Sequence, residues 1–213
     1  MTRIGTTIIW EKLLLNNVRI VQSDEIRAMA QDIGKDYARS LRYLLEHRYL
    51  MRILRGIFYV LDQEEREGGS NKRTIYELVS EALAIKGARH WYLALETALK
   101  LNGLTHEYFT VNYVITDNYR TTKVIGIGDL RFRFSRWRGE MFSFGLKREF
   151  DLIFSDKEKT ILDMVHRNYL HSKDRKYSVA PLREYSRELD KKKVREYLAH
   201  YNARVREIVE EEL

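Results

Sequence analysis

The sequence predicts an α+β fold with two domains. Only one proline occurs among 213 residues, which favours helices over rigid turns. Apolar residues recur at helical spacing near both ends of the chain, whereas short apolar or alternating runs typical of strands fill its middle. A polar, glycine-containing run at 63–73 interrupts the pattern and predicts a linker between domains at 1–62 and 74–213.

The first domain is expected to hold three helices followed by a hairpin. The first helix should end at Asn16, and Ser23 and Asp36 should cap the second and third, because their side-chain oxygens can accept hydrogen bonds from exposed helix amides. Strand-like runs follow at 49–54 and 57–61, and the tight turn between them is at 55–56. This order of helices and hairpin is that of a winged helix-turn-helix.

The second domain is expected to be mixed α/β, with a helical C-terminal tail. Ser155 and Glu158 form a capping-box pattern at the start of one helix. In the tail, apolar residues recur at spacings of four and three, which indicates a packing stripe: Val194, Leu198, Tyr201, Val205 and Ile208. The other expected elements are helices at 74–85 and 93–101 and strands at 109–116, 123–127, 130–136, 141–146 and 150–154.

The amino-acid composition excludes several classes of protein. The chain carries 38 lysines and arginines against 31 aspartates and glutamates, a formal charge of +7 that is spread almost evenly and permits an anionic partner. The lack of cysteine excludes disulfides, thiol catalysis and cysteine-ligated metals. No apolar run approaches the roughly 18–20 residues that a bilayer requires. We therefore expect a soluble cytoplasmic protein with no membrane partner.

The third helix and the hairpin carry the residues expected to bind duplex DNA. DNA is read by a helix in the major groove, with cations on phosphates for affinity and side chains on base edges for specificity. The candidates on or just before the helix, and then on the hairpin, are Lys35, Arg39, Ser40, Arg42, Tyr43, Arg52 and Arg55. The alternative interpretation is a solvated helix face and an ordinary basic turn.

A second basic stretch lies at 131–138. Strict alternation places Arg131 and Arg133 on one face of a strand and Phe132 and Phe134 on the other. One interpretation is an amphipathic strand whose aromatic side chains enter the core. The other is a basic patch that docks an acidic protein surface or nucleic acid through its four arginines, Arg131, Arg133, Arg136 and Arg138.

Enzyme signatures are weak in this sequence. The six histidines are scattered without metal-ligand spacing, and Gly126-Ile127-Gly128 lacks the third glycine of a dinucleotide-binding motif. Glu149 and Asp151 share a strand face and could hold a metal in a nuclease, but no lysine-bearing acidic motif completes such a site. We therefore expect a protein that is not an enzyme and needs no cofactor or metal.

Three stretches follow one another in a recognisable order. They are LRGIFYV at 54–60, YLALETALKLNGL at 92–104 and SDKEKTILD at 155–163. Together they resemble the AbiEi-type antitoxins, the abortive-infection transcriptional regulators of type IV toxin–antitoxin systems in bacteria and archaea. The first stretch corresponds to the wing of that family.

The resemblance implies an N-terminal winged helix that binds repeats in the promoter of its own operon, and a C-terminal domain that counters a nucleotidyltransferase-like toxin. By position it assigns Lys35, Arg39, Ser40, Arg42 and Tyr43 to the recognition helix and Arg55 to the wing. It implies no catalytic residues. A homodimer would suit operator repeats, because helix-turn-helix proteins commonly read paired half-sites. The alternative function is a protein-interaction module that docks a partner through 131–138 without binding DNA.

Overall fold

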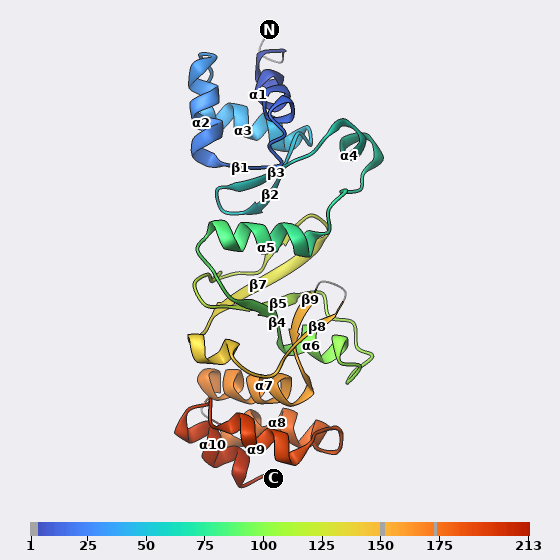
Figure 1. Ribbon diagram of the computed structural model, residues 1–213, viewed down its shortest axis with the longest axis vertical. Coiled ribbons are helices and arrows are strands. Elements are labelled where there is room, and N and C mark those ends of the chain that lie inside the picture. Colours follow the sequence, from blue (N-terminus) through green and yellow to red (C-terminus); the bar gives the residue numbers. More distant parts are fainter. Residues whose placement is uncertain (1–3, 150–151, 173) are drawn as a thin grey trace. The chain divides into compact units, whose positions relative to one another are not determined.

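The computed structural model describes residues 4–149, 152–172 and 174–213 and has a mixed α+β fold, as predicted (Figure 1). It divides into two compact units. The first contains the chain up to Ile85 together with 126–130, and the second contains 86–125 and 131–213. The division therefore falls after Ile85 and not in the polar run at 63–73. Part of that run is a helix, α4 (Gln63–Gly68), where an irregular linker was expected.

The first unit places three helices against a small antiparallel sheet. The strand order is β1-β3-β2, and the helices share one apolar core with the sheet that includes Ile9, Leu13, Ile26, Leu44 and Phe58. In Figure 1, α1, α2 and α3 lie on the same side of this sheet. Besides α4, the elements are α1 (Ile4–Leu15), β1 (Ile20–Gln22), α2 (Ser23–Asp32), α3 (Tyr37–Glu46), β2 (Leu50–Leu54), β3 (Ile57–Val60) and α5 (Ile75–Ile85).

Only one of the two predicted caps in this unit is confirmed. Asp36 caps α3, because its carboxylate accepts a hydrogen bond from the Arg39 amide at 2.9 Å. Ser23 is instead the first residue of α2, and its amide donates to the Gly56 carbonyl at 2.9 Å. The sequence-based assignment was wrong because this tertiary hydrogen bond holds the start of α2 against the hairpin turn.

Charged side chains anchor α4 to the sheet. Glu65 is buried and accepts hydrogen bonds from the Tyr59 hydroxyl at 2.6 Å, the Lys72 amide at 2.7 Å and the Arg19 guanidinium at 2.5 Å. Burial opposes ionisation of Glu65, but these hydrogen bonds and the Arg19 charge outweigh it and lower the pKa of the carboxyl. The anchored glutamate explains why a segment of linker-like composition folds as part of the first unit.

The second unit contains a larger sheet with the order β6-β7-β5-β4-β9-β8, whose β6–β7 turn belongs to the first unit. In Figure 1, the C-terminal helices α7 to α10 lie together at one side of this sheet. The strands are β4 (Trp91–Leu93), β5 (Asn112–Thr116), β6 (Ile125–Ile127), β7 (Leu130–Arg136), β8 (Leu146–Glu149) and β9 (Leu152–Ser155). The helices are α6 (Leu95–Leu101), α7 (Lys157–Ser172), α8 (Arg175–Tyr185), α9 (Lys191–Leu198) and α10 (Ala203–Glu210), with short 3₁₀ turns at Gly139–Phe142 and Ser186–Glu188.

Two local predictions in this unit were wrong. The expected strand at 141–146 is a 3₁₀ turn followed by β8, and Met141 in that turn is buried in the core. The capping residue of α7 is Asp156, whose carboxylate accepts from the Lys159 amide at 2.9 Å. Ser155 cannot cap the helix because it ends β9 and its hydroxyl bonds Thr160 at 2.7 Å.

The predicted packing stripe of the tail is confirmed. All five of its apolar residues are buried in the main core of the second unit, although the tail is divided into α9 and α10. Asp190 begins α9 by accepting a hydrogen bond from the Lys192 amide at 2.8 Å. Its own amide donates to Glu158 at 3.1 Å. The C-terminal helices therefore complete the core that positions the end of β7.

Candidate nucleic-acid interface

Helix α3 separates the predicted DNA-binding residues into two groups. Ser40 and Leu44 lie one turn apart on the same face and are both buried, Ser40 with only 3% of its surface exposed. Arg39 and Arg42 lie on the exposed side of the same helix. The expectation that Ser40 lies on the exposed face of the helix was therefore wrong, because its side chain packs on the core side.

Tyr43 belongs to an aromatic cluster of the first unit. Its ring stacks on His47, with ring centroids 4.1 Å apart, and on Tyr49 at 6.0 Å. The guanidinium of Arg66 lies 3.7 Å from the centroid of Tyr49 and 5.0 Å from that of Trp10, so a half-buried cation completes the cluster. Tyr43 is half-buried here, and its ring packs against the end of α3.

The hairpin presents its two candidate arginines differently. Gly56 adopts a φ of +78°, which permits the tight turn, and Arg55 is exposed beside it at the tip. Arg52 is exposed on β2, and its guanidinium lies 5.6 Å from the centroid of Phe58. The Ser23 amide holds Gly56, so the tip of the hairpin is fixed at the start of α2.

Within the described residues, the candidate cations of the first unit form no ion pair, a property that they share with Lys12, Arg48 and Arg66. Arg19, Arg27, Lys72 and Arg73 each form an ion pair with a carboxylate. Among the DNA-binding candidates, and within the described residues, no charged nitrogen has a carboxylate within 4 Å. These candidates are Lys35, Arg39, Arg42, Arg52 and Arg55. Lys35 and Arg39 also line a pocket of about 560 Å³ beside α3.

The alternation predicted for the basic strand is confirmed. Phe132 and Phe134 are at most 1% exposed on one face of β7, while Arg131 and Arg133 are exposed on the other. Five consecutive residues of β7 pair in parallel with β5, which fixes the register of the strand. The aromatic side chains therefore anchor the strand, and the arginines remain available to a partner.

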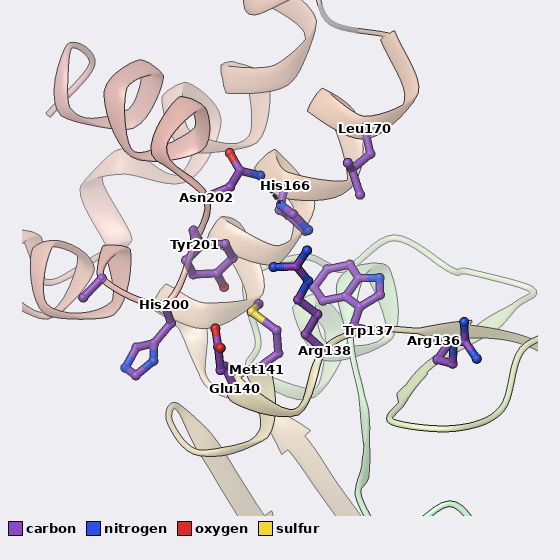
Figure 2. A pocket seen from close by; sticks show the side chains of 11 residues that line it. Arg136, Trp137, Arg138, Glu140, Met141, His166, Leu170, His200, Tyr201 and Asn202 are labelled. Atoms are coloured by element: carbon purple, nitrogen blue, oxygen red, sulfur yellow. Dashed lines mark hydrogen bonds between the residues drawn. The ribbon is translucent and has the colours of Figure 1, made fainter.

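The end of this stretch opens onto a pocket of about 520 Å³ (Figure 2). The pocket is lined by residues from the end of β7 and the segment after it, from α7, and from the turn between α9 and α10: Arg136, Trp137, Arg138, Glu140, Met141, His166, Leu170, Ala199, His200, Tyr201 and Asn202. Arg133 and Arg136 line a neighbouring pocket together with Arg120 and Arg167. The four arginines of 131–138 thus do not all line one pocket.

His166 forms one wall of the first pocket. Its ring meets Trp137 edge to face with centroids 5.0 Å apart, and Tyr201 at 5.8 Å. Burial, and then the charges of Lys159 and Arg138, lower the pKa of His166 to about 4. The imidazole is therefore neutral at neutral pH, and the positive charges of this wall come from lysine and arginine.

A buried ion pair that was not predicted from the sequence lies behind this wall. Lys159 and Asp163 are both 0% exposed, with Nζ 3.2 Å from Oδ1. Asp163 also accepts hydrogen bonds from the hydroxyls of Tyr92 at 2.9 Å and Tyr201 at 2.6 Å. The available signal was the spacing of four between a lysine and an aspartate within an otherwise apolar helical stretch.

The described part of the chain contains no metal site of the kind that the nuclease hypothesis requires. Glu149 is paired with Lys147 at 2.8 Å on β8, and Asp151 lies outside the described residues. Among the described residues, no group of three histidines, aspartates or glutamates could hold a metal ion. The described helices also include none that is both long and apolar enough to span a bilayer.

Comparison with known proteins bears on the fold alone. The chain matches no protein-family model and no curated protein. Among solved structures, it is similar to the crystal structure of the RV2827C protein from Mycobacterium tuberculosis, with a TM-score of 0.51 and 11% sequence identity. The match covers 94% of this chain and 73% of that chain. It therefore supports the mixed α+β architecture over almost the whole chain.

Proposed function

We propose that this chain is a DNA-binding transcriptional regulator that acts as the antitoxin of a type IV, AbiE-like toxin–antitoxin system. In this proposal the first unit is a winged helix that reads operator repeats, with α3 in the major groove and the β2–β3 hairpin as the wing. The element order α1-β1-α2-α3-β2-β3, with β1 paired to β3, supports this interpretation.

The observation that carries the proposal is the set of unpaired cations on α3 and the hairpin. An arginine without a carboxylate partner can bind a phosphate without first breaking an ion pair, and each such contact also releases counterions from DNA. Arg39 and Arg42 lie three residues apart on the exposed side of α3, as successive phosphate or base contacts would require. Arg55 at the hairpin tip would bind the backbone beside the groove.

The antitoxin half of the proposal rests on the second unit and on the family resemblance. Arg131 and Arg133 extend from a rigid strand and, within the described residues, form no ion pair with a carboxylate. Such a row of cations suits an acidic surface of a nucleotidyltransferase-like toxin. Replacing both arginines with glutamine should weaken rescue of cells that express the neighbouring toxin, while operator binding stays unchanged.

The DNA-binding half is tested with the full chain and a duplex from upstream of its own reading frame. A variant carrying Arg39→Ala and Arg42→Ala should lose operator binding in a gel-shift titration at moderate salt. The matched control carries Arg187→Ala and Arg195→Ala, which remove the same charge from exposed positions of the second unit. Equal affinity of the Arg39/Arg42 variant and the unaltered protein, with the fold intact by circular dichroism, would refute the assignment.

A further inference from the structure

We propose that the pocket around Trp137 and Arg138 binds a nucleoside phosphate. All its lining residues belong to the second unit, so this inference does not depend on DNA binding by the first unit. A volume of about 520 Å³ lies within the range of small-molecule sites. The pocket combines a cation, aromatic rings and a carboxylate, and each matches a different part of such a ligand.

Arg138 supplies the phosphate-binding group. Figure 2 shows its guanidinium directed toward the space beside Trp137 and His166, while Arg136 lies apart from this group. Within the described residues, Arg138 forms no ion pair, so its charge is not neutralised by a neighbouring carboxylate. Guanidinium groups bind phosphate oxygens in a bidentate manner, which makes Arg138 the preferred anchor for the anionic end of the ligand.

The aromatic wall supplies the contacts for a planar base. Trp137, His166 and Tyr201 form a continuous series of edge-to-face contacts, with Met141 beside them as an apolar, adaptable surface. Because the Tyr201 hydroxyl already donates to Asp163, Tyr201 offers the pocket mainly its ring. A base placed against this wall would gain stacking or edge contacts of the kind that hold bases in nucleic-acid-binding proteins.

Two further side chains fit the sugar and the base edge. Glu140 lines the pocket with a carboxylate that can accept hydrogen bonds from ribose hydroxyls or a base amino group. Asn202 uses its side-chain oxygen to cap α10 through the Val205 amide, at 2.9 Å, which leaves its amide nitrogen directed toward His166, 3.5 Å away. Glu140 would repel a bare anion, whereas the ribose or base of a nucleoside phosphate would donate hydrogen bonds to its carboxylate.

The electrostatics of the pocket agree with an anionic ligand. Burial is the largest cause of the lowered pKa of His166, and the positive charges of Lys159 and Arg138 add to it, because each disfavours a charged imidazolium at this wall. Lys159 is already compensated by Asp163, whereas Arg138 has no such partner among the described residues. A bound phosphate would therefore compensate the charge of Arg138 beside His166.

The test measures binding of the four ribonucleoside monophosphates to the full chain by isothermal titration calorimetry, with inorganic phosphate and adenosine as partial ligands. At least one monophosphate should bind more tightly than either partial ligand. Arg138→Gln should weaken that binding about tenfold or more, the loss expected for one charge-assisted contact. Arg131→Gln removes the same charge from the same stretch but lines neither pocket, so it should leave the affinity within about twofold.

Three results would overturn the proposal. They are no detectable binding of any monophosphate at millimolar concentration, equal affinity for inorganic phosphate, and equal weakening by Arg131→Gln and Arg138→Gln. The last result would mean that the net charge of the protein attracts the ligand without a built site. Trp137→Leu gives a second check, because it should weaken monophosphate binding while leaving the weaker binding of inorganic phosphate unchanged.

Discussion

Lys159 and Asp163 lie one helical turn apart on α7, fully buried, with the lysine Nζ 3.2 Å from an aspartate oxygen. Burial lowers the pKa of Lys159 and raises that of Asp163, because the interior disfavours both charges. Their mutual attraction and the two tyrosine hydroxyls on Asp163 offset this cost. The lysine also lies over the ring of Phe144, 4.1 Å from its centroid.

Removing one partner of this pair should be strongly destabilising. Lys159→Met leaves a buried carboxylate without its cation and should lower the free energy of unfolding by about 3–5 kcal/mol. Lys147→Met is the matched control, because the side chains of Lys147 and Glu149 are 42% and 45% exposed and their ion pair should contribute only about 0–1 kcal/mol. Urea unfolding of both variants measures the difference, and equal effects would contradict the importance of burial.

Gly145 should tolerate no side chain. Its φ is +60°, and a Cβ there would lie 2.8 Å from Cβ of Lys159 and 2.9 Å from the ring of Tyr197. Gly145→Ala should therefore lower the free energy of unfolding by about 1–3 kcal/mol through strain and overpacking. Gly139→Ala is the control, since it has ordinary φ and open space around it. Equal melting temperatures of the two variants would contradict the prediction, because they would show that the side chains of Lys159 and Tyr197 move aside without cost.

The second unit should lose stability as the pH falls from about 6.5 to about 4. The pKa of His166 is about 4 in the folded chain, against an ordinary 6.5, so in this range the unfolded chain binds the additional proton. The contribution of neutral His166 to the free energy of unfolding is complete above pH 6.5 and is lost as the pH falls toward 4. His166→Gln should flatten this part of the stability profile.

Exposed His171 on the same helix serves as the control for His166. His171→Gln should leave the slope between pH 6.5 and 4 unchanged when the free energy of unfolding is measured by urea denaturation. A folded-state pKa near 6.5 for His166, measured by NMR titration, would contradict the prediction directly.

The salt dependence of operator binding should report the phosphate contacts of the first unit. If Arg55 binds a phosphate, Arg55→Ala should reduce the slope of log affinity against log salt concentration by about 0.9. Arg73→Ala should leave the slope unchanged, because Arg73 is paired with Glu81 at 2.7 Å. Fluorescence anisotropy titrations between low and moderate salt measure both slopes. An unchanged slope for Arg55→Ala would show that Arg55 binds no phosphate.

The fold class was predictable because periodicity and caps are local. The Asp36 cap, the alternation on β7 and the apolar stripe of the tail all depend on spacing within one element, and the structure confirms each. The failures depend on distant residues. Ser23 is engaged by Gly56 through a tertiary hydrogen bond, and Glu65 is held by Arg19 from another part of the chain.

The candidate sites show the same limit. Exposure of Arg39 and Arg42 follows from helical spacing, but burial of Ser40 depends on how tightly the core closes around α3. The pocket near Arg138 joins three segments that are far apart in the sequence, so no local pattern indicates it. Sequence spacing therefore located the basic residues, while their grouping required the three-dimensional structure.

The turn between β6 and β7 belongs to the first unit, although it is encoded well after the first 85 residues. Ile127, at the end of β6, is fully buried, and a side chain at Gly128 would lie 2.7 Å from Ile75. A ribosome releases these residues only after α1 to α5 have emerged. The contact between this segment and Ile75 can therefore form only after residue 130 has been translated, so this part of the first unit is completed while the second unit is being synthesised.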